Sequence, residues 1–276
     1  MTIGESDAGG FIAFAEQLAD AAAQETLRHF RQLIAIEDKA GGGRMDPVTE
    51  ADRGAETAIR QMITKHFPSH GIVGEEFENK PADSAYEWVL DPIDGTRSFV
   101  TGVPLWGTLI CLQKDGVPLI GLIDQPYIGE RFIGGATKSG GAGKAWLNAK
   151  GATMTLATSG CEELCKASLG TTTSEVFVTN AEKDAFSLAS KDVRMLRFGG
   201  DCYLYAMLAA GHLDLVIEAS LKPFDVAALV PIVESAGGVI TQWSGEPAHL
   251  GGRIVAAATP ALHEAALAKL AEGYGG

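Results

Sequence analysis

The sequence predicts a mixed α/β (α+β) protein with two sheets, each covered by helices. Short β-branched segments separated by Gly, Pro and Asp dominate residues 71–133, which is typical of a mostly antiparallel sheet. Beyond about residue 150, strand-like and helix-like segments alternate, which indicates an α/β layer. We therefore expect two domains, residues 1–150 and 151–276, joined near Ala149–Thr158.

Two helices are expected before the first sheet. An alanine-rich amphipathic pattern spans Phe11 to Ile36, and a glycine-rich loop follows it. A second helix is expected after Asp46–Thr49, with apolar residues on one face and Pro68 as its end. The strands of the first sheet are expected at Gly71–Gly74, Glu87–Leu90, Gly107–Gln113, Pro118–Ile123 and Arg131–Ile133.

The second half of the chain is expected to alternate strands with helices. The expected strands are Ser168–Thr171, Val193–Phe198, Leu213–Ile217, Gly238–Thr241 and Ile254–Ala257. The expected helices are Asn180–Ser190, Asp201–Ala210, Val226–Ser235 and Ala261–Leu270.

The composition is that of an ordinary globular chain. Its 276 residues, 46% of them hydrophobic and 21% charged, allow a sizeable core. Because there is no run of about 18 apolar residues and no secretory pattern at the N-terminus, we expect no membrane partner and a cytoplasmic location. The net charge of −13 disfavours nucleic acid and suits divalent cations. The four cysteines form no C-x-x-C pair, so we expect buried thiols in a reducing compartment.

Several common active-site signatures are absent from the sequence. Lys138 and Ala145 stand where a P-loop needs Gly and Ser/Thr. The histidines form neither H-x-H nor H-E-x-x-H, which argues against a histidine-ligated zinc site, and there is no G-x-S-x-G nucleophile elbow. Asp91 and Asp94 are also spaced too widely for the D-x-D motif of aspartyl-phosphate phosphatases.

Two aspartates follow a buried strand in the segment DPIDGT, residues 91–96. An ordinary turn is one interpretation, because Pro, Asp and Gly all favour turns. The other is a site for a hard cation, since Asp91, Asp94 and the carbonyl of Ile93 can converge on one point. Gly95 would then allow close approach of the backbone, and Thr96 adds a hydroxyl that can orient water.

Further carboxylates stand at the ends of expected strands and helices. Glu75 and Glu76 close another strand and could be only a solvated turn. Asp52 fits a helix capping box, and Asp225 fits a helix N-cap. Because these residues come from both halves of the chain, a cleft between the two sheets would bring them together.

Four motifs together carry a family resemblance: DPVTEAD (46–52), GEE (74–76), DPIDGT (91–96) and PFDVAA (223–228). In order and spacing, over roughly residues 10–270, they resemble the inositol-monophosphatase superfamily of Mg²⁺-dependent phosphatases. The resemblance implies a five-layer α-β-α-β-α sandwich of the sugar-phosphatase type. It also implies two or three Mg²⁺ ions per active site, a small-molecule phosphate ester as substrate, and a homodimer.

The resemblance implies a role for each motif residue. Glu75, Asp91 and the carbonyl of Ile93 would bind the first metal, and Asp91, Asp94 and Asp225 the second. Phe224 replaces the Trp that the family usually has before the last aspartate, which changes only a packing neighbour.

The remaining motif residues would serve the reaction itself. Asp52 and Thr96 match the pair that positions and deprotonates the attacking water, with Glu75 beside them as a catalytic carboxylate and Glu76 as a supporting acid. Lys39 corresponds to a family lysine near a third, weaker metal, in a loop that is longer here. Two cations can activate water and stabilise the leaving oxygen, so no covalent nucleophile is required.

The substrate is expected to be histidinol phosphate. Arg97 and the segments GGDCYLYA (199–206) and KPFDVAALVPIVESAGG (222–238) resemble the histidinol-phosphate phosphatases of this superfamily, which implies a step of histidine biosynthesis. Asp201 and Glu218 would suit the ammonium and imidazole of that substrate, next to Gly95 and Thr96. Arg97 would brace an acidic substrate-binding residue or the phosphate.

Alternatives to this prediction stay open. Asp201 could be only a helix N-cap, and Arg97 only a surface side chain. Other substrates within the superfamily are inositol 1-phosphate and adenosine 3′,5′-bisphosphate. A non-catalytic metal or ligand sensor on the same fold is a more distant alternative.

Overall fold

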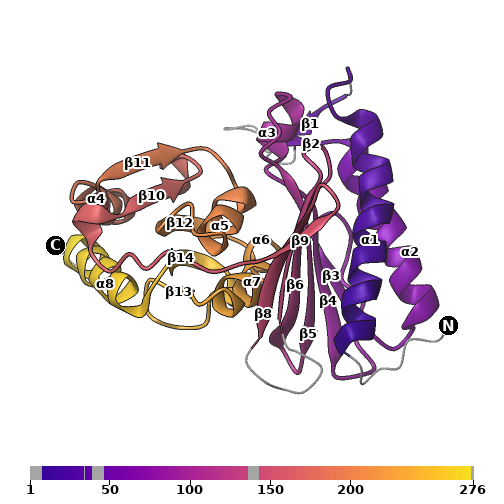
Figure 1. Ribbon diagram of the computed structural model, residues 1–276. Helices are drawn as coiled ribbons and strands as arrows, with labels where there is room; N and C mark the ends of the chain where they lie inside the picture. The colour runs from indigo at the N-terminus through magenta and orange to yellow at the C-terminus, as the bar shows by residue number, and fades with distance from the viewer. Residues whose placement is uncertain (1–7, 34, 39–46, 136–142, 275–276) are drawn as a thin grey trace.

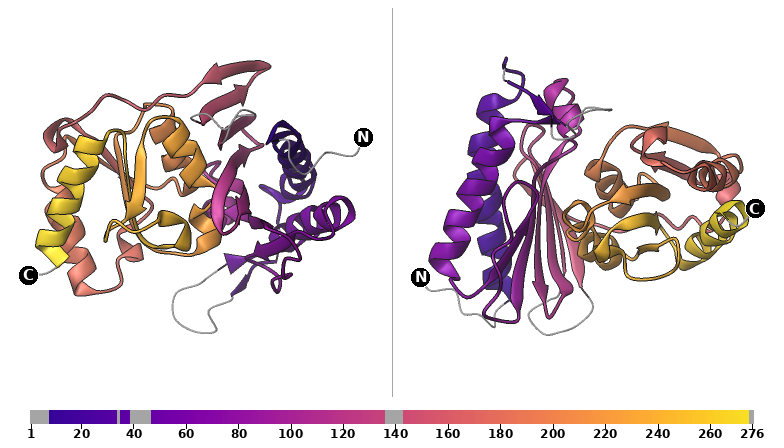
Figure 2. Two further views of the ribbon diagram at one scale, coloured as in Figure 1. Left: turned by 90° about the horizontal axis from the view of Figure 1, so that it is seen from below. Right: turned by 180° about the vertical axis from the view of Figure 1, so that it is seen from behind.

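The computed structural model describes residues 8–33, 35–38, 47–135 and 143–274. Its elements form five layers: two N-terminal helices, a seven-stranded sheet, a middle layer of helices, a five-stranded sheet and two outer helices (Figures 1 and 2). The expected α-β-α-β-α sandwich with two sheets is therefore confirmed.

The first sheet has the strand order β3-β4-β5-β6-β7-β8-β9. Only β3 and β4 pair in parallel, and all later neighbours pair antiparallel, as the sequence predicts. The strands are β3 (Gly71–Gly74), β4 (Tyr86–Asp94), β5 (Gly107–Lys114), β6 (Val117–Gln125), β7 (Glu130–Gly135), β8 (Lys144–Ala149) and β9 (Ala152–Thr155).

Alternate residues of this sheet enter two different hydrophobic cores. Trp88 and Leu90 of β4 face helices α1 (Ala8–His29) and α2 (Glu50–His66), whereas Val89 faces the middle helices. This alternation follows from the two-residue period of a strand. Because both faces of the central strands are covered, those strands are apolar almost throughout, which is why they are recognisable in the sequence.

The second sheet has the strand order β11-β10-β12-β14-β13 and combines parallel with antiparallel pairs. Its strands are β10 (Ser168–Thr171), β11 (Met195–Phe198), β12 (Leu215–Leu221), β13 (Val239–Gln242) and β14 (Gly252–Ala257). Helices α4 (Asn180–Ser190) and α8 (Pro260–Tyr274) cover its outer face through a third core. The short elements are β1 (Glu37–Asp38), β2 (Pro47–Val48), α3 (Thr96–Val100), η1 (Leu164–Lys166), η2 (Ser174–Val176) and η3 (Ala248–Leu250).

The middle layer joins the two sheets. It contains α5 (Cys202–Ala209), α6 (Pro223–Val226) and α7 (Leu229–Ser235). The backbone at the start of α7 lies against glycines of the first sheet: a Cβ added at Gly121 would lie 1.9 Å from the Ala228 carbonyl oxygen. Only glycine allows this approach, so the distance between the layers depends on it.

Several expected boundaries were wrong. The first helix ends at His29 rather than Ile36, because Arg31 adopts a positive φ of 61° that an α-helix cannot contain. The expected helix Val226–Ser235 is divided into α6 and α7.

Strands β8 and β9 were not predicted, and β9 lies in the segment expected to join the two sheets. Their turn has positive φ at Lys150 and Gly151, as in a type I′ hairpin. The division of the chain into domains at residue 150 stays a prediction.

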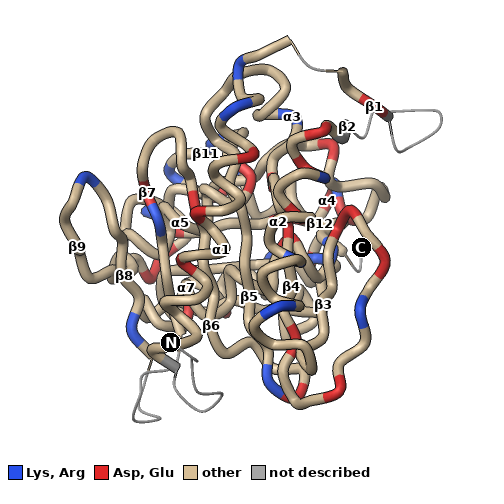
Figure 3. Tube along the Cα trace, turned by 90° about the vertical axis from the view of Figure 1, so that its right-hand side faces the viewer, with Lys and Arg blue, Asp and Glu red and all other residues tan. Residues whose placement is uncertain are grey.

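Within the part of the chain that the structure describes, no helix combines the length and apolarity needed to cross a membrane. Lysines and arginines are scattered among the acidic residues along the trace rather than collected in one region (Figure 3). The loop expected to carry Lys39 falls in 39–46, outside the described residues.

Candidate metal centre and active site

The segment expected to be a turn is the end of strand β4, interrupted by a bulge. Asp91 pairs with Leu109 and Asp94 with Gly107, so three steps along β4 match two steps along β5. In a regular strand, residues three apart point to opposite faces; the extra residue removes this alternation and lets both aspartates face the same side. The backbone N–H of Ile93 donates to Asp91 Oδ1 at 3.0 Å, which holds the bulge. The turn interpretation is therefore corrected to a bulged strand end.

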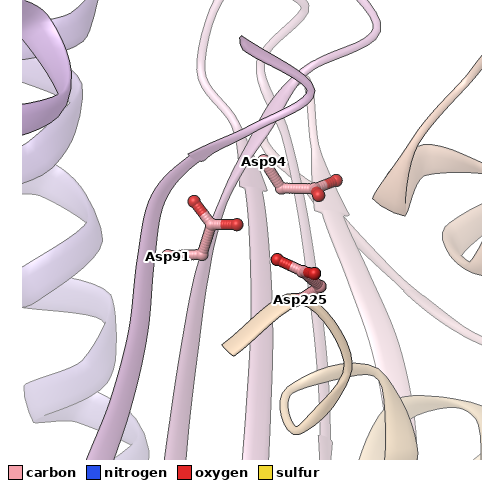
Figure 4. A group of neighbouring side chains, drawn as sticks. All are labelled: Asp91, Asp94 and Asp225. Carbon is pink, nitrogen blue, oxygen red and sulfur yellow. The ribbon is translucent and has the colours of Figure 1, made fainter. Parts of the chain in front are cut away.

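A third carboxylate comes from the other half of the chain. Carboxylate oxygens of Asp91, Asp94 and Asp225 lie within 4.8 Å of one another (Figure 4). Asp225 is the third residue of α6 and accepts the backbone N–H of Lys222 at 2.6 Å, so it is not itself the N-cap. Asp94 Oδ2 accepts the N–H of Cys202, the first residue of α5, at 2.6 Å. Each aspartate is thus fixed by a backbone N–H.

This cluster carries more negative charge than its surroundings balance. Burial, together with Glu75 and the other aspartates, raises the pKa of Asp91 well above its ordinary value. Burial and the neighbouring Asp201 and Asp225 do the same for the pKa of Asp94. Burial raises the pKa of Asp225 to about 7, against the lowering effect of the Lys222 N–H. Closely spaced carboxylate oxygens are the ligands that Mg²⁺ prefers, so the residues fit divalent cations.

Asp52 lies in the first turn of helix α2 and also has an acceptor atom without a partner among the described residues. Its Oδ2 accepts the Thr49 N–H at 2.8 Å and the Thr49 hydroxyl at 2.6 Å, so the expected capping box is present. Its Oδ1 is buried and has no hydrogen-bond partner among the described residues. Burial raises the pKa of Asp52 to about 6 despite the Thr49 bonds. The Thr96 hydroxyl donates to the Ile93 carbonyl at 3.1 Å.

The segment after β3 is held by a buried residue of α2 that the sequence motifs did not reveal. The backbone N–H of Glu76 donates to Glu56 Oε2 at 2.8 Å, and Arg60 pairs with Glu56 Oε1 at 2.6 Å. A Cβ at Gly74 would lie 2.0 Å from this carboxylate, so a larger residue there would displace Glu56. Glu75 thereby lies close enough to the cluster to raise the pKa values of Asp91, Asp225 and Asp52.

A pocket of about 260 Å³ opens beside the cluster, between α3, α5 and β12. Asp201 lines it at the N-cap position of α5, but among the described residues its side chain makes no capping bond. Its carboxylate instead accepts the Ser98 hydroxyl at 2.9 Å. Burial raises the pKa of Asp201, and Ser98 and Arg97 oppose this increase. Asp201 therefore lines the pocket with its carboxylate bonded to α3 rather than to the backbone of α5.

The pocket also contains a second buried carboxylate, on β12. Glu218 accepts the Thr172 N–H at 2.9 Å and the Tyr205 hydroxyl at 3.0 Å. Burial raises the pKa of Glu218 to about 7 despite these bonds. At the rim, Arg97 lies 3.8 Å from Glu175, an ion pair between the two halves of the chain.

Most predicted site residues are brought together. Asp52 and Glu75 lie beside the aspartate cluster, and Gly95, Thr96, Arg97, Asp201 and Glu218 line the adjoining pocket. Lys39 lies outside the described residues. Two supporting residues were not predicted from the sequence. The only signal for Glu56 is its position four residues after Asp52 and four before Arg60 on α2, and Ser98 carries no signal.

Comparisons with known proteins match almost the whole chain. The profile of the "Inositol monophosphatase family" matches residues 8–274. The bifunctional phosphatase IMPL2 of Arabidopsis thaliana chloroplasts is 44% identical over 88% of this chain and 67% of its own. The histidinol-phosphatase of Chlorobaculum parvum is 33% identical over 95% of this chain and 97% of its own. The structure of an inositol monophosphatase from Zymomonas mobilis has a TM-score of 0.81 and 39% identity, and covers 94% of this chain and 96% of its own.

Proposed function

Because the chain belongs to the inositol monophosphatase family, we propose that it is a Mg²⁺-dependent phosphatase that converts histidinol phosphate to L-histidinol and phosphate. Family membership makes the chain a metal-dependent phosphomonoesterase. We propose histidinol phosphate as its substrate. The observation that carries it is the pocket itself. Beside the aspartate cluster, which suits cations that would in turn bind the phosphate, the pocket holds two more carboxylates, Asp201 and Glu218.

These two carboxylates favour a substrate whose alcohol part is a cation. Histidinol carries an ammonium group and a titratable imidazole, whereas inositol offers only hydroxyl groups. Burial raises the pKa values of both Asp201 and Glu218, so a cation bound between them would relieve an existing electrostatic cost. The similarity to the Chlorobaculum parvum histidinol-phosphatase supports the same choice.

The proposed chemistry assigns a task to each group. Two bound Mg²⁺ ions would neutralise the phosphate and activate water. The groups that would hold them are Glu75, Asp91, the Ile93 carbonyl, Asp94 and Asp225. Asp52 Oδ1, the buried acceptor, takes a proton from the attacking water while the Thr96 hydroxyl orients it. The water oxygen forms a bond to phosphorus, and the bond from phosphorus to the alcohol oxygen breaks. The alcohol oxygen takes up a proton from solvent water, and Asp52 later returns its proton to solvent.

The experiment is phosphate release from histidinol phosphate, inositol 1-phosphate and adenosine 3′,5′-bisphosphate, each with Mg²⁺ and with EDTA. We expect histidinol phosphate to have the highest kcat/KM and EDTA to abolish all activity. If inositol 1-phosphate were favoured by about tenfold or more, which is about 1.4 kcal/mol, the substrate assignment would be wrong. Activity that persists in EDTA would refute the metal mechanism.

A second candidate, inositol monophosphatase, is favoured by one observation. The Zymomonas mobilis structure described as an inositol monophosphatase is 39% identical to this chain. The same substrate panel distinguishes the two. A role in histidine biosynthesis, a cytoplasmic location, a homodimer and a third cation near Lys39 and Glu76 stay predictions from the sequence.

A further inference from the structure

Ser98 contacts a pocket residue from outside the pocket. It lies on α3 and does not belong to the pocket lining among the described residues. Its hydroxyl nevertheless donates to Asp201 Oδ2 at 2.9 Å, across 103 residues of sequence. The bond therefore joins the segment after the metal-binding bulge to the start of α5.

The conformation of Asp201 is unusual and needs support. Its φ of 46° and ψ of −136° place it outside the regions that non-glycine residues favour, so neighbouring contacts must hold it. Gly95 supplies one of them: a Cβ there would lie 2.9 Å from Cγ of Asp201. The carboxyl group thus packs directly on the start of α3, and Ser98 fixes its rotation.

Without the Ser98 bond, the carboxylate would have another charged partner. Arg97 is the neighbouring residue on α3 whose positive charge acts on Asp201. A carboxylate that turned toward the guanidinium would be less available to a cation in the pocket. The Ser98 hydroxyl holds it without neutralising its charge.

We propose that Ser98 is a positioning residue that sets substrate specificity, because it holds the Asp201 carboxylate toward the cationic part of the substrate alcohol. The inference rests on the proposed function for the identity of that alcohol. Ser98 itself would not contact the substrate. A neutral alcohol would gain nothing from the oriented charge.

The test measures binding of L-histidinol and of myo-inositol by NMR titration, which needs no turnover. We expect Ser98→Ala to weaken L-histidinol binding about five- to tenfold and myo-inositol binding less than about twofold. Ser98→Thr, which keeps the hydroxyl, should bind L-histidinol within about twofold of the unmodified protein. In an Asp201→Asn background, Ser98→Ala should add no further loss.

Thr101→Ala is the matched control. The Thr101 hydroxyl donates to the Arg97 and Ser98 carbonyls of the same helix, at 2.8 and 3.2 Å, so this change loosens α3 without touching Asp201. An equal loss for both alcohols, an equal loss in Thr101→Ala, or a loss that persists beside Asp201→Asn would overturn the inference.

Hydrolysis of histidinol phosphate is measured separately from this binding. If the chain does not hydrolyse it but L-histidinol binding depends on Ser98, only the proposed function fails. If the chain hydrolyses it and Ser98→Ala binds L-histidinol normally, only the role of Ser98 fails.

Discussion

Replacing Asp225 with Asn is expected to stabilise the metal-free protein at alkaline pH and to remove its stabilisation by Mg²⁺. The Asn side-chain oxygen can still accept the Lys222 N–H that Asp225 accepts at 2.6 Å, so the start of α6 is preserved. What the substitution removes is a buried negative charge close to Glu75 and Glu218.

The magnitude follows from the pKa of Asp225, which burial raises from 3.8 to about 7. A raised pKa means that the folded state holds the proton more tightly than the unfolded chain. The stability that the neutral carboxyl contributes is therefore complete below about pH 4 and is lost as the pH rises through about 7. Each pKa unit corresponds to about 1.4 kcal/mol, so above pH 7 the wild type loses at most about 4 kcal/mol. Asn carries no charge and avoids this loss, which amounts to several degrees in Tm.

The assay is differential scanning calorimetry at about pH 5 and about pH 8, in EDTA and in Mg²⁺. Asp192→Asn is the matched control, because the pKa of Asp192 is lowered by its hydrogen bond to Lys269 and its loss should not stabilise the protein. In EDTA at about pH 8, an Asp225→Asn protein no more stable than the wild type would refute the electrostatic reasoning. An equal gain from Mg²⁺ in both proteins would show that Asp225 binds no metal.

Three further predictions concern the water-activating group, a buried carboxyl group and the packing of the layers. Asp52→Asn should lower kcat by about 10²- to 10⁴-fold with little change in KM, because the proton acceptor is lost; steady-state kinetics of histidinol phosphate hydrolysis tests this. In EDTA, the melting temperature of the wild type should fall between about pH 5 and about pH 8, because burial raises the pKa of Glu218 to about 7 and only its neutral form stabilises the fold. Glu218→Gln carries no charge, so its melting temperature should fall less over the same pH range. An equally steep pH dependence in the variant would contradict this. Gly121→Ala should destabilise the protein by about 1–3 kcal/mol or more in urea unfolding, because the new Cβ would lie 1.9 Å from the carbonyl oxygen of Ala228, the N-cap residue of α7. The control is Gly160→Ala, whose new Cβ has no atom within 4 Å. It should change the free energy of unfolding by less than about 0.5 kcal/mol.

Most strands were predictable because both faces of the central strands are covered. Strands such as β5 and β6 therefore appear as continuous apolar segments between turn residues. The hairpin of β8 and β9 was missed because β9 is exposed along its whole length and carries no apolar pattern. The end of α1 depends on the positive φ of Arg31, which composition does not indicate.

The candidate metal-ligating carboxylates were predictable from their position: Glu75, Asp91, Asp94 and Asp225 stand near the start or end of a strand or helix, close to Pro or Gly. Their supporting contacts were not. Glu56 reaches Glu76 across 20 residues, and Ser98 reaches Asp201 across 103, so only the folded chain reveals them. The bulge at Asp91–Asp94 is likewise set by pairing with β5 rather than by local preference.

We propose that Asp91, Asp94 and Asp225 hold the cations required to hydrolyse a phosphate ester. The most direct test is anomalous diffraction from a crystal of the protein soaked in Mn²⁺, which takes the same oxygen ligands as Mg²⁺. We expect a strong peak in contact with oxygens of all three aspartates and a second peak between Asp91 and Glu75. Peaks only at other acidic residues, with none at this cluster, would contradict it.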